Sequence, residues 1–185
     1  MASLALNACK KEDFAYEKRF DRSYETWLKF KAASGNSYRY EVFGATWAWI
    51  RSSWHTTIHV RNGKVVRRDF YYEVFAGMQM PEGGWDETSV NELSERLAHP
   101  LTEPLQWTEM ENELGSHETS AASRIQTLDE IYETARTQWL KKRDDAQISF
   151  ETDNNGMISY AGFTPNGCVD DCFSGISIRS IEAIK

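Results

Sequence analysis

The chain has 185 residues, of which 41% are hydrophobic and 13% aromatic, enough for a packed core and too many for a chain disordered throughout. The formal net charge of −7 argues against nucleic acid as a partner and against a basic membrane-binding surface. The sequence contains no apolar run long enough to span a bilayer.

The first residues, MASLALNACKKED, contain a short apolar segment that ends in a small residue before Cys9. The letters LNAC resemble a bacterial lipobox, where a signal peptide is cut and the new terminal cysteine is acylated. The apolar segment is too short for a complete signal sequence, so we expect residues 1–11 to be a signal remnant and tether lipidated at Cys9. The alternative is a tail whose cysteine is buried.

The three cysteines are consistent with that expectation. If Cys9 carries lipid, Cys168 and Cys172 remain as a pair, which an oxidising envelope compartment would allow to form a disulfide. Closing so short a loop would stabilise the fold by about 2 kcal/mol at most, so its effect would be to fix the loop's shape. A zinc site would need two more ligands nearby, and none are suitably spaced.

The first half of the chain predicts a helix followed by strands. Residues 12–33 have aromatic and aliphatic side chains at helical spacing. Residues 37–43 alternate and are rich in Tyr and Val, which predicts a strand. The Asn-Gly pair at 62–63 predicts a hairpin between residues 54–61 and 64–72.

The pattern is lost over residues 76–124, an excursion that contains only a short predicted helix at 89–98. A capping box at 127–130 then starts a helix with one apolar face. That face comprises Leu128, Ile131, Tyr132, Ala135 and Trp139. A second hairpin turns at residues 154–156, and an alternating strand ends the chain.

The expected order is therefore helix, three strands, excursion, helix and two strands. It predicts an α+β fold in which an antiparallel sheet of about five strands packs two main helices on one face. Residues 12–185 would form a single domain with an irregular excursion at 76–124.

Several short motifs resemble a widespread bacterial family, the domain of unknown function DUF six-one-seven-four. They are NSYRYEV, HVRNGKVV, TLDEIYE and a DNNG hairpin, spread between Tyr24 and Ile181. The family's hairpin carries Asp-Pro and Gly-Tyr-Pro, which this chain lacks, and the excursion is longer than expected. The resemblance implies a secreted protein or envelope lipoprotein and supplies no catalytic residue. CKKED is also similar to the start of surface lipoproteins in Bacteroidota.

The stretch TWAWIRSSWHTTIHV contains two tryptophans, Trp47 and Trp49, that are candidates for binding a ligand or partner. On a strand, His55 and His59 would share a solvent-facing side, opposite Trp54, Ile58 and Val60. One interpretation is a plain sheet wall. The other is an exposed aromatic platform of Trp47 and Trp49, joined by Trp85 and Trp107 from the excursion, that binds a sugar or a protein.

The excursion also suggests a metal site. Glu113 and His117 are four residues apart, and on a helix they would share a face as two metal ligands. A hydrolase could add His55 or His59. The third ligand is missing, and the sequence contains no nucleophile elbow, P-loop or dinucleotide fingerprint. We therefore name no catalytic residue, metal or cofactor.

Together these observations predict a lipid-anchored protein of the bacterial cell envelope, at the outer membrane or cell surface, or alternatively a secreted protein. We expect a non-enzymatic module that binds a protein or glycan, with no nucleic acid partner and contact with the membrane through the lipid alone. The alternative is a metal-dependent hydrolase that uses the excursion's His/Glu cluster.

Overall fold

The computed structural model describes residues 14–47 and 50–184. Its elements are α1 (Glu17–Ala33), β1 (Tyr38–Thr46), β2 (Ser52–Arg61), β3 (Lys64–Phe75), β4 (Met78–Gln79), α2 (Glu87–Leu97), β5 (Gln106–Met110), α3 (Leu128–Thr134), the π-helix η1 (Ala135–Trp139), β6 (Ala146–Glu151), β7 (Tyr160–Pro165) and β8 (Ser174–Ala183). The strands form one open sheet in the order β4-β3-β2-β1-β8-β7-β6, and β5 also pairs with β3. The α+β class and the antiparallel sheet are confirmed, but the sheet has eight strands rather than about five.

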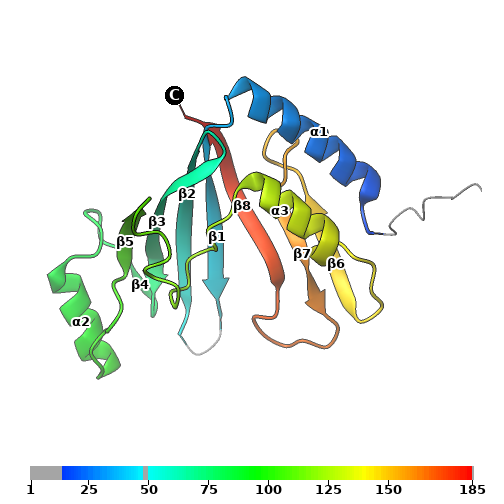
Figure 1. Ribbon diagram of the computed structural model, residues 1–185. Coiled ribbons are helices and arrows are strands. Elements are labelled where there is room, and N and C mark those ends of the chain that lie inside the picture. Colours follow the sequence, from blue (N-terminus) through cyan, green and yellow to red (C-terminus); the bar gives the residue numbers. More distant parts are fainter. Residues whose placement is uncertain (1–13, 48–49, 185) are drawn as a thin grey trace, which may run out of the picture.

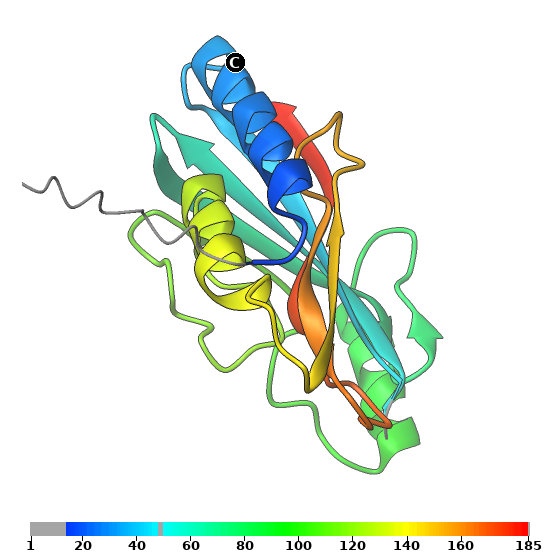
Figure 2. The same ribbon diagram turned by 90° about the vertical axis from the view of Figure 1, so that its right-hand side faces the viewer.

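The helices α1 and α3 lie on the same face of the sheet, as Figure 2 shows. Their apolar sides meet the strands in the main core, where Trp27 of α1 and Tyr132 of α3 stack. The core also contains Phe20, Tyr38, Tyr40, Ile58, Val60, Leu128, Ile131, Phe150, Ile158, Ala161 and Ile178. The other face of the sheet has polar side chains such as those of Glu41 and Asp69, together with a few rings, among them Phe43 and Tyr71.

The turn between β2 and β3 follows directly from its sequence. Asn62 and Gly63 have φ angles of 48° and 78°, which Asn and Gly tolerate better than other residues. Arg61 pairs with Lys64, so the turn consists of Asn62 and Gly63 alone. The predicted first hairpin is confirmed, although both strands are longer than expected.

The excursion contains the predicted short helix, α2, and in addition two strands, β4 and β5, so it is more regular than predicted. β5 pairs with β3, with Trp107 opposite Phe70. α2 starts at an Asp86 capping box and buries Leu93 against Trp85 and Leu105 in a small second core. We call residues 76–105 the side lobe; it lies at the far end of the sheet from β6 (Figure 1).

The second half of the chain folds largely as predicted. The Thr127–Glu130 capping box starts α3, and η1 continues it to Trp139. Four of the five predicted face residues are buried, while Trp139 is only partly buried against the core. β6 and β7 form the second hairpin. Within residues 14–47 and 50–184, no helix is both long enough and apolar enough to cross a bilayer.

Candidate functional site

A broad hollow opens where β1 and β8 separate. The two strands pair from Tyr38 and Ala183 as far as Val42 and Ile178, and the register skips Arg179. Such a bulge bends its strand and increases the local twist. Beyond it the two strands diverge, as Figure 1 shows beneath α3.

The resulting cavity, which we call the β1–β8 cleft, has a volume of about 970 Å³. Its walls are the last residues of β1 and the first residues of β8, with aromatic and polar side chains around them. These side chains are Trp54, Trp139, Tyr160, Phe173, Arg124, Gln126, Gln138 and Asp171. Flat rings among a few polar groups are typical of a site that binds an organic ligand or a peptide.

Glycines give the aromatic rings of the cleft their positions. A Cβ atom on Gly44 would collide with the Trp54 ring, so only glycine lets that ring lie over β1. Gly162 and Gly175 do the same for Phe173, which stacks on Tyr160 with 4.5 Å between ring centroids. The sequence therefore creates flat strand surfaces on which these rings rest.

Asp171 joins β1 to the loop before β8 at the outer end of the cleft. Its carboxylate accepts hydrogen bonds from the Thr46 hydroxyl and, at 3.2 Å, from the Trp47 backbone N–H. The Trp47 side chain is 73% exposed, and Val169 on the facing loop is 98% exposed. Two large apolar side chains are therefore presented to solvent beside the mouth of the cleft.

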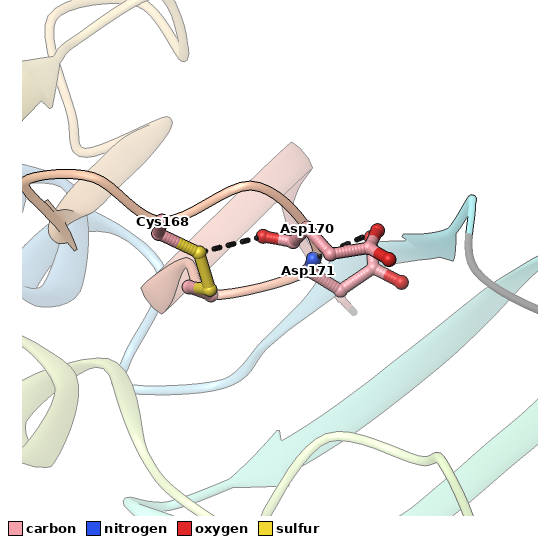
Figure 3. The surroundings of a disulfide bond; sticks show 4 residues. Cys168, Asp170 and Asp171 are labelled. Atoms are coloured by element: carbon pink, nitrogen blue, oxygen red, sulfur yellow. Dashed lines mark hydrogen bonds between the residues drawn. A yellow bond between two sulfur atoms is a disulfide. The ribbon is translucent and has the colours of Figure 1, made fainter.

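A disulfide between Cys168 and Cys172 closes the loop that contains Asp171, with 6.3 Å between the two Cα atoms. Figure 3 shows Asp170 and Asp171 between the two cysteines, facing the end of β1. The predicted pairing of these cysteines is present in the structure. Cys9, the predicted lipidation site, lies outside the described residues.

The structure does not assemble the predicted tryptophan platform. Trp85 is only 7% exposed, and its indole N–H donates to the Tyr72 carbonyl within the side lobe's core. The Trp107 ring stacks between Phe70 and His117, at centroid distances of 5.1 and 4.2 Å. Trp49 lies outside the described residues, so Trp47 is the one candidate that the structure presents to solvent.

His55 is buried rather than solvent-facing as predicted. Phe43 and Tyr71 cover its ring, and Tyr71 stacks on it at 4.9 Å. Its Nδ1 lies 2.9 Å from a Glu41 carboxylate oxygen, and its Nε2 lies 3.4 Å from Glu73. With a carboxylate at each ring nitrogen, neither nitrogen is positioned for a substrate or a metal.

His59 is partly exposed, and its Nε2 lies 2.9 Å from a carboxylate oxygen of Asp69. Burial raises the pKa of Asp69, but hydrogen bonds from His59, Arg67 and Thr108 outweigh it and hold the pKa well below the usual range. This group ties β2, β3 and β5 together on the open face of the sheet. Its bonds are internal, which favours a structural role.

The excursion's acidic cluster is organised around Glu109, a fully buried side chain whose importance the sequence does not reveal. It accepts bonds from the Arg68 guanidinium at 2.7 and 2.9 Å, and from the backbone N–H groups of Gly115 and His117. Burial raises the pKa of Glu109, but these bonds outweigh it and lower the pKa to about 2. Four acidic residues lie at positions 109 to 118, and nothing in their spacing singles out Glu109.

The predicted metal pair is not formed. His117 turns its ring nitrogen toward Glu109, whereas Glu113 is exposed and accepts from the Met110 backbone N–H. The segment forms turns instead of the helix that would have aligned the two. In the described part of the chain, no three His, Cys, Asp or Glu side chains lie close enough to hold a metal ion.

No protein-family model, no curated protein and no solved structure matches this chain. The resemblance to the bacterial family named above therefore stays a prediction.

Proposed function

We propose that the protein is a non-enzymatic binding module of the bacterial cell envelope, tethered through a lipid on Cys9, that engages a protein or glycan partner at the β1–β8 cleft and its mouth. The observation that carries the proposal is Trp47, a 73% exposed indole beside the β1–β8 cleft. A tryptophan presents a large apolar area with few rotatable bonds, so it is favoured at the centre of binding sites.

The support around Trp47 strengthens this proposal. Its backbone is held by Asp171, and the disulfide limits the motion of the loop that provides Asp171. A restrained backbone loses little entropy on binding, so more of the contact energy of the Trp47 ring remains as affinity. An exposed tryptophan without such support would be a weaker indication.

The envelope location rests on the sequence. The lipobox-like LNAC supports it, and a disulfide between the other two cysteines fits an oxidising compartment. Expression of the gene from its natural start in a bacterial host, followed by mass spectrometry of the peptide containing Cys9, tests it. We expect an acylated terminal cysteine, and an unmodified internal Cys9 would reject the tether.

The binding role is tested by photo-crosslinking in the producing organism. A photoreactive phenylalanine analogue replaces Trp47 in one strain and Leu28 in another. Leu28 is a matched control because it is also exposed, on α1. We expect a specific adduct, protein or polysaccharide, from position 47 and none from position 28.

The purified adduct partner then gives the quantitative test. Removal of a central tryptophan typically costs about 2 kcal/mol of binding energy, or roughly 30-fold in affinity. We therefore expect Trp47→Ala to weaken binding by about that factor and Leu28→Ala to leave it unchanged. Equal binding by both variants would reject the role of Trp47.

A further inference from the structure

The segment that leads into α3 lines the β1–β8 cleft and is held to the sheet on both sides of Arg124. The Ser123 backbone N–H donates to one side chain of the sheet at 3.0 Å, and the Ser123 carbonyl accepts from a second at 3.2 Å. The Gln126 carbonyl accepts from a third. These three buried side chains are those of Thr56, Arg68 and Tyr40. The backbone on each side of Arg124 is therefore fixed.

The polar side chains on this fixed segment have no bonds of their own. Among the residues that the structure describes, nothing bonds the Arg124 guanidinium or the Gln126 side-chain amide, although both residues line the cleft. Three buried side chains thus position a backbone whose polar side chains are left unbonded. Groups that are held in place and unbonded are what a binding site offers a ligand, because little order is lost when the ligand arrives.

Another wall of the cleft is formed by the π-helix η1. This helix forms where the Leu140 N–H donates to the Ala135 carbonyl, five residues earlier in the chain. Gln138 and Trp139 line the cleft from η1, and within the described part of the chain neither the Gln138 amide nor the Trp139 indole N–H has a partner. Segments of π-helix are rare and frequently occur at functional sites. The wall therefore adds two more unbonded polar groups to those of the fixed segment.

The free charge in the cleft is positive, although the protein as a whole is acidic. The chain has a net charge of −7, but the charged residues that line the cleft are one cation, Arg124, and one anion, Asp171. The Asp171 carboxylate is bonded to the Thr46 hydroxyl and the Trp47 backbone N–H, and Arg124 forms no ion pair with any described residue. The Arg124 guanidinium is thus available to a ligand, and its planar fork of N–H groups matches a carboxylate.

Trp54 and Trp139 place two indoles in the cleft. Each indole has a flat apolar face and one N–H donor at its edge, and neither N–H is bonded by any residue that the structure describes. A sugar ring combines the same properties, because its C–H groups make one face apolar while the hydroxyls along its edge donate and accept. The Gln126 and Gln138 amides also donate and accept. The indoles thus suit the ring of a sugar, the amides suit its hydroxyls, and Arg124 suits a carboxylate on it.

We propose that the β1–β8 cleft binds an acidic glycan, with a carboxylate of the sugar bonded to Arg124 and the sugar ring against the indoles of Trp54 and Trp139. The cavity volume of about 970 Å³ is at the upper end of the range for small-ligand sites, roughly 300–1,000 Å³, so the cleft has room for more than one sugar ring. The inference rests on the proposed binding function and names the partner as a carboxylate-bearing saccharide. Trp47 at the mouth contacts the next sugar of the chain.

The test uses the full chain and an array of oligosaccharides that carry uronate, sialate or muramate units, each placed beside its carboxyl-reduced form. We expect binding to acidic glycans, and at least about tenfold weaker binding to the reduced form, because an alcohol does not replace the charged partner of the guanidinium. Titration calorimetry with the acidic glycan that binds most tightly, and with its reduced form, then gives the two affinities.

Variants of three exposed residues assign the effect to the cleft. Arg124→Gln should weaken binding of the acidic glycan by roughly 10- to 100-fold and remove the preference over the reduced form. Gln138→Ala should weaken binding of both forms alike, by roughly 3- to 10-fold, and keep the preference. Arg61→Gln is the control and should change neither affinity, because Arg61 is exposed at the end of β2 and does not line the cleft.

Three results would overturn the inference. They are no binding to any acidic glycan on the array, equal binding to the reduced forms, and an unchanged preference in Arg124→Gln. A protein adduct at position 47 with no binding on the array would retain the binding function and reject the glycan. Glycan binding that depends on Arg124, with no adduct at position 47, would retain the glycan site and reject the role of Trp47.

Discussion

Buried charge in this protein is concentrated at Arg68 and Glu109, whose side chains are 4% and 0% exposed. The pair links β3 to β5, and Glu109 also collects the backbone N–H groups of Gly115 and His117. A buried ion pair stabilises a fold little more than well-packed apolar residues in the same place would. Removing one partner is costly, however, because the other charge then stays buried without a counter-charge. Glu109 therefore anchors the turns after β5 to the sheet.

Replacing Glu109 by Gln should destabilise the fold by about 3 kcal/mol or more, because the buried Arg68 guanidinium loses its counter-charge. Urea unfolding followed by tryptophan fluorescence measures the change. Glu113→Gln is the matched control, since Glu113 is exposed in the same segment, and it should cost less than about 0.5 kcal/mol. A similar loss in both variants would contradict this account.

Lowering the pH should remove the stability that Glu109 provides. The folded-state pKa of Glu109 is about 2, below its ordinary value of 4.5, so ionised Glu109 stabilises the fold above about pH 4.5. That contribution decreases as the pH falls from about 4.5 and is lost through about 2. The difference in unfolding free energy between wild type and Glu109→Gln should shrink over this window. A difference that stays constant from pH 7 to pH 3 would show that ionisation is not the cause.

The elements differ in how far the sequence predicts them. The β2–β3 hairpin and α3 are predictable because the Asn-Gly turn and the capping box are local signals. β5 is not, because its partner strand lies some 40 residues earlier, at Arg67–Tyr71. The burial of His55 could not be predicted for a similar reason. Alternation along β2 correctly puts His55 on the polar face, but Phe43 and Tyr71 from the neighbouring strands cover its ring. The β1–β8 cleft depends on a bulge that no sequence motif marks.

A substitution at Gly175 tests how closely β7 and β8 approach each other at the cleft. A Cβ atom there would collide with the Ala161 carbonyl oxygen and the Phe173 ring. Gly175→Ala should therefore lower the free energy of unfolding by about 1–3 kcal/mol, the usual cost of overpacking. Gly83→Ala is the control, because no atom lies within 4 Å of its added Cβ. Equal stability of the two variants in a thermal melt would contradict the close approach.

At the scale of the whole molecule, residues 14–47 and 50–184 form two separate cores. The main core joins α1, α3 and the sheet, whereas the side lobe packs Trp85, Leu93 and Leu105 on the outer end of β3. A small core contributes little free energy, so the lobe should open more readily than the rest. Local stability is therefore expected to vary along the sheet.

Limited proteolysis should show this difference. Leu93→Ala removes a fully buried side chain from the small core, and we expect cleavage within residues 80–104 while the main fold stays intact. Ile131→Ala, equally buried in the main core, should instead lower global stability by about 2–5 kcal/mol. Simultaneous unfolding of both regions in both variants would mean that the two cores act as one.

The way the side lobe joins the sheet has a consequence for how such proteins can diversify. The lobe leaves through Gln79, opposite Val74, and the chain returns at Gln106, opposite Tyr71. Both ends of the lobe therefore attach to the same strand, three positions apart. A lineage could acquire, exchange or discard this appendage by replacing it with a short connection, without altering the order of the other strands. The surface of the lobe can thus change without replacing any residue that lines the cleft between β1 and β8.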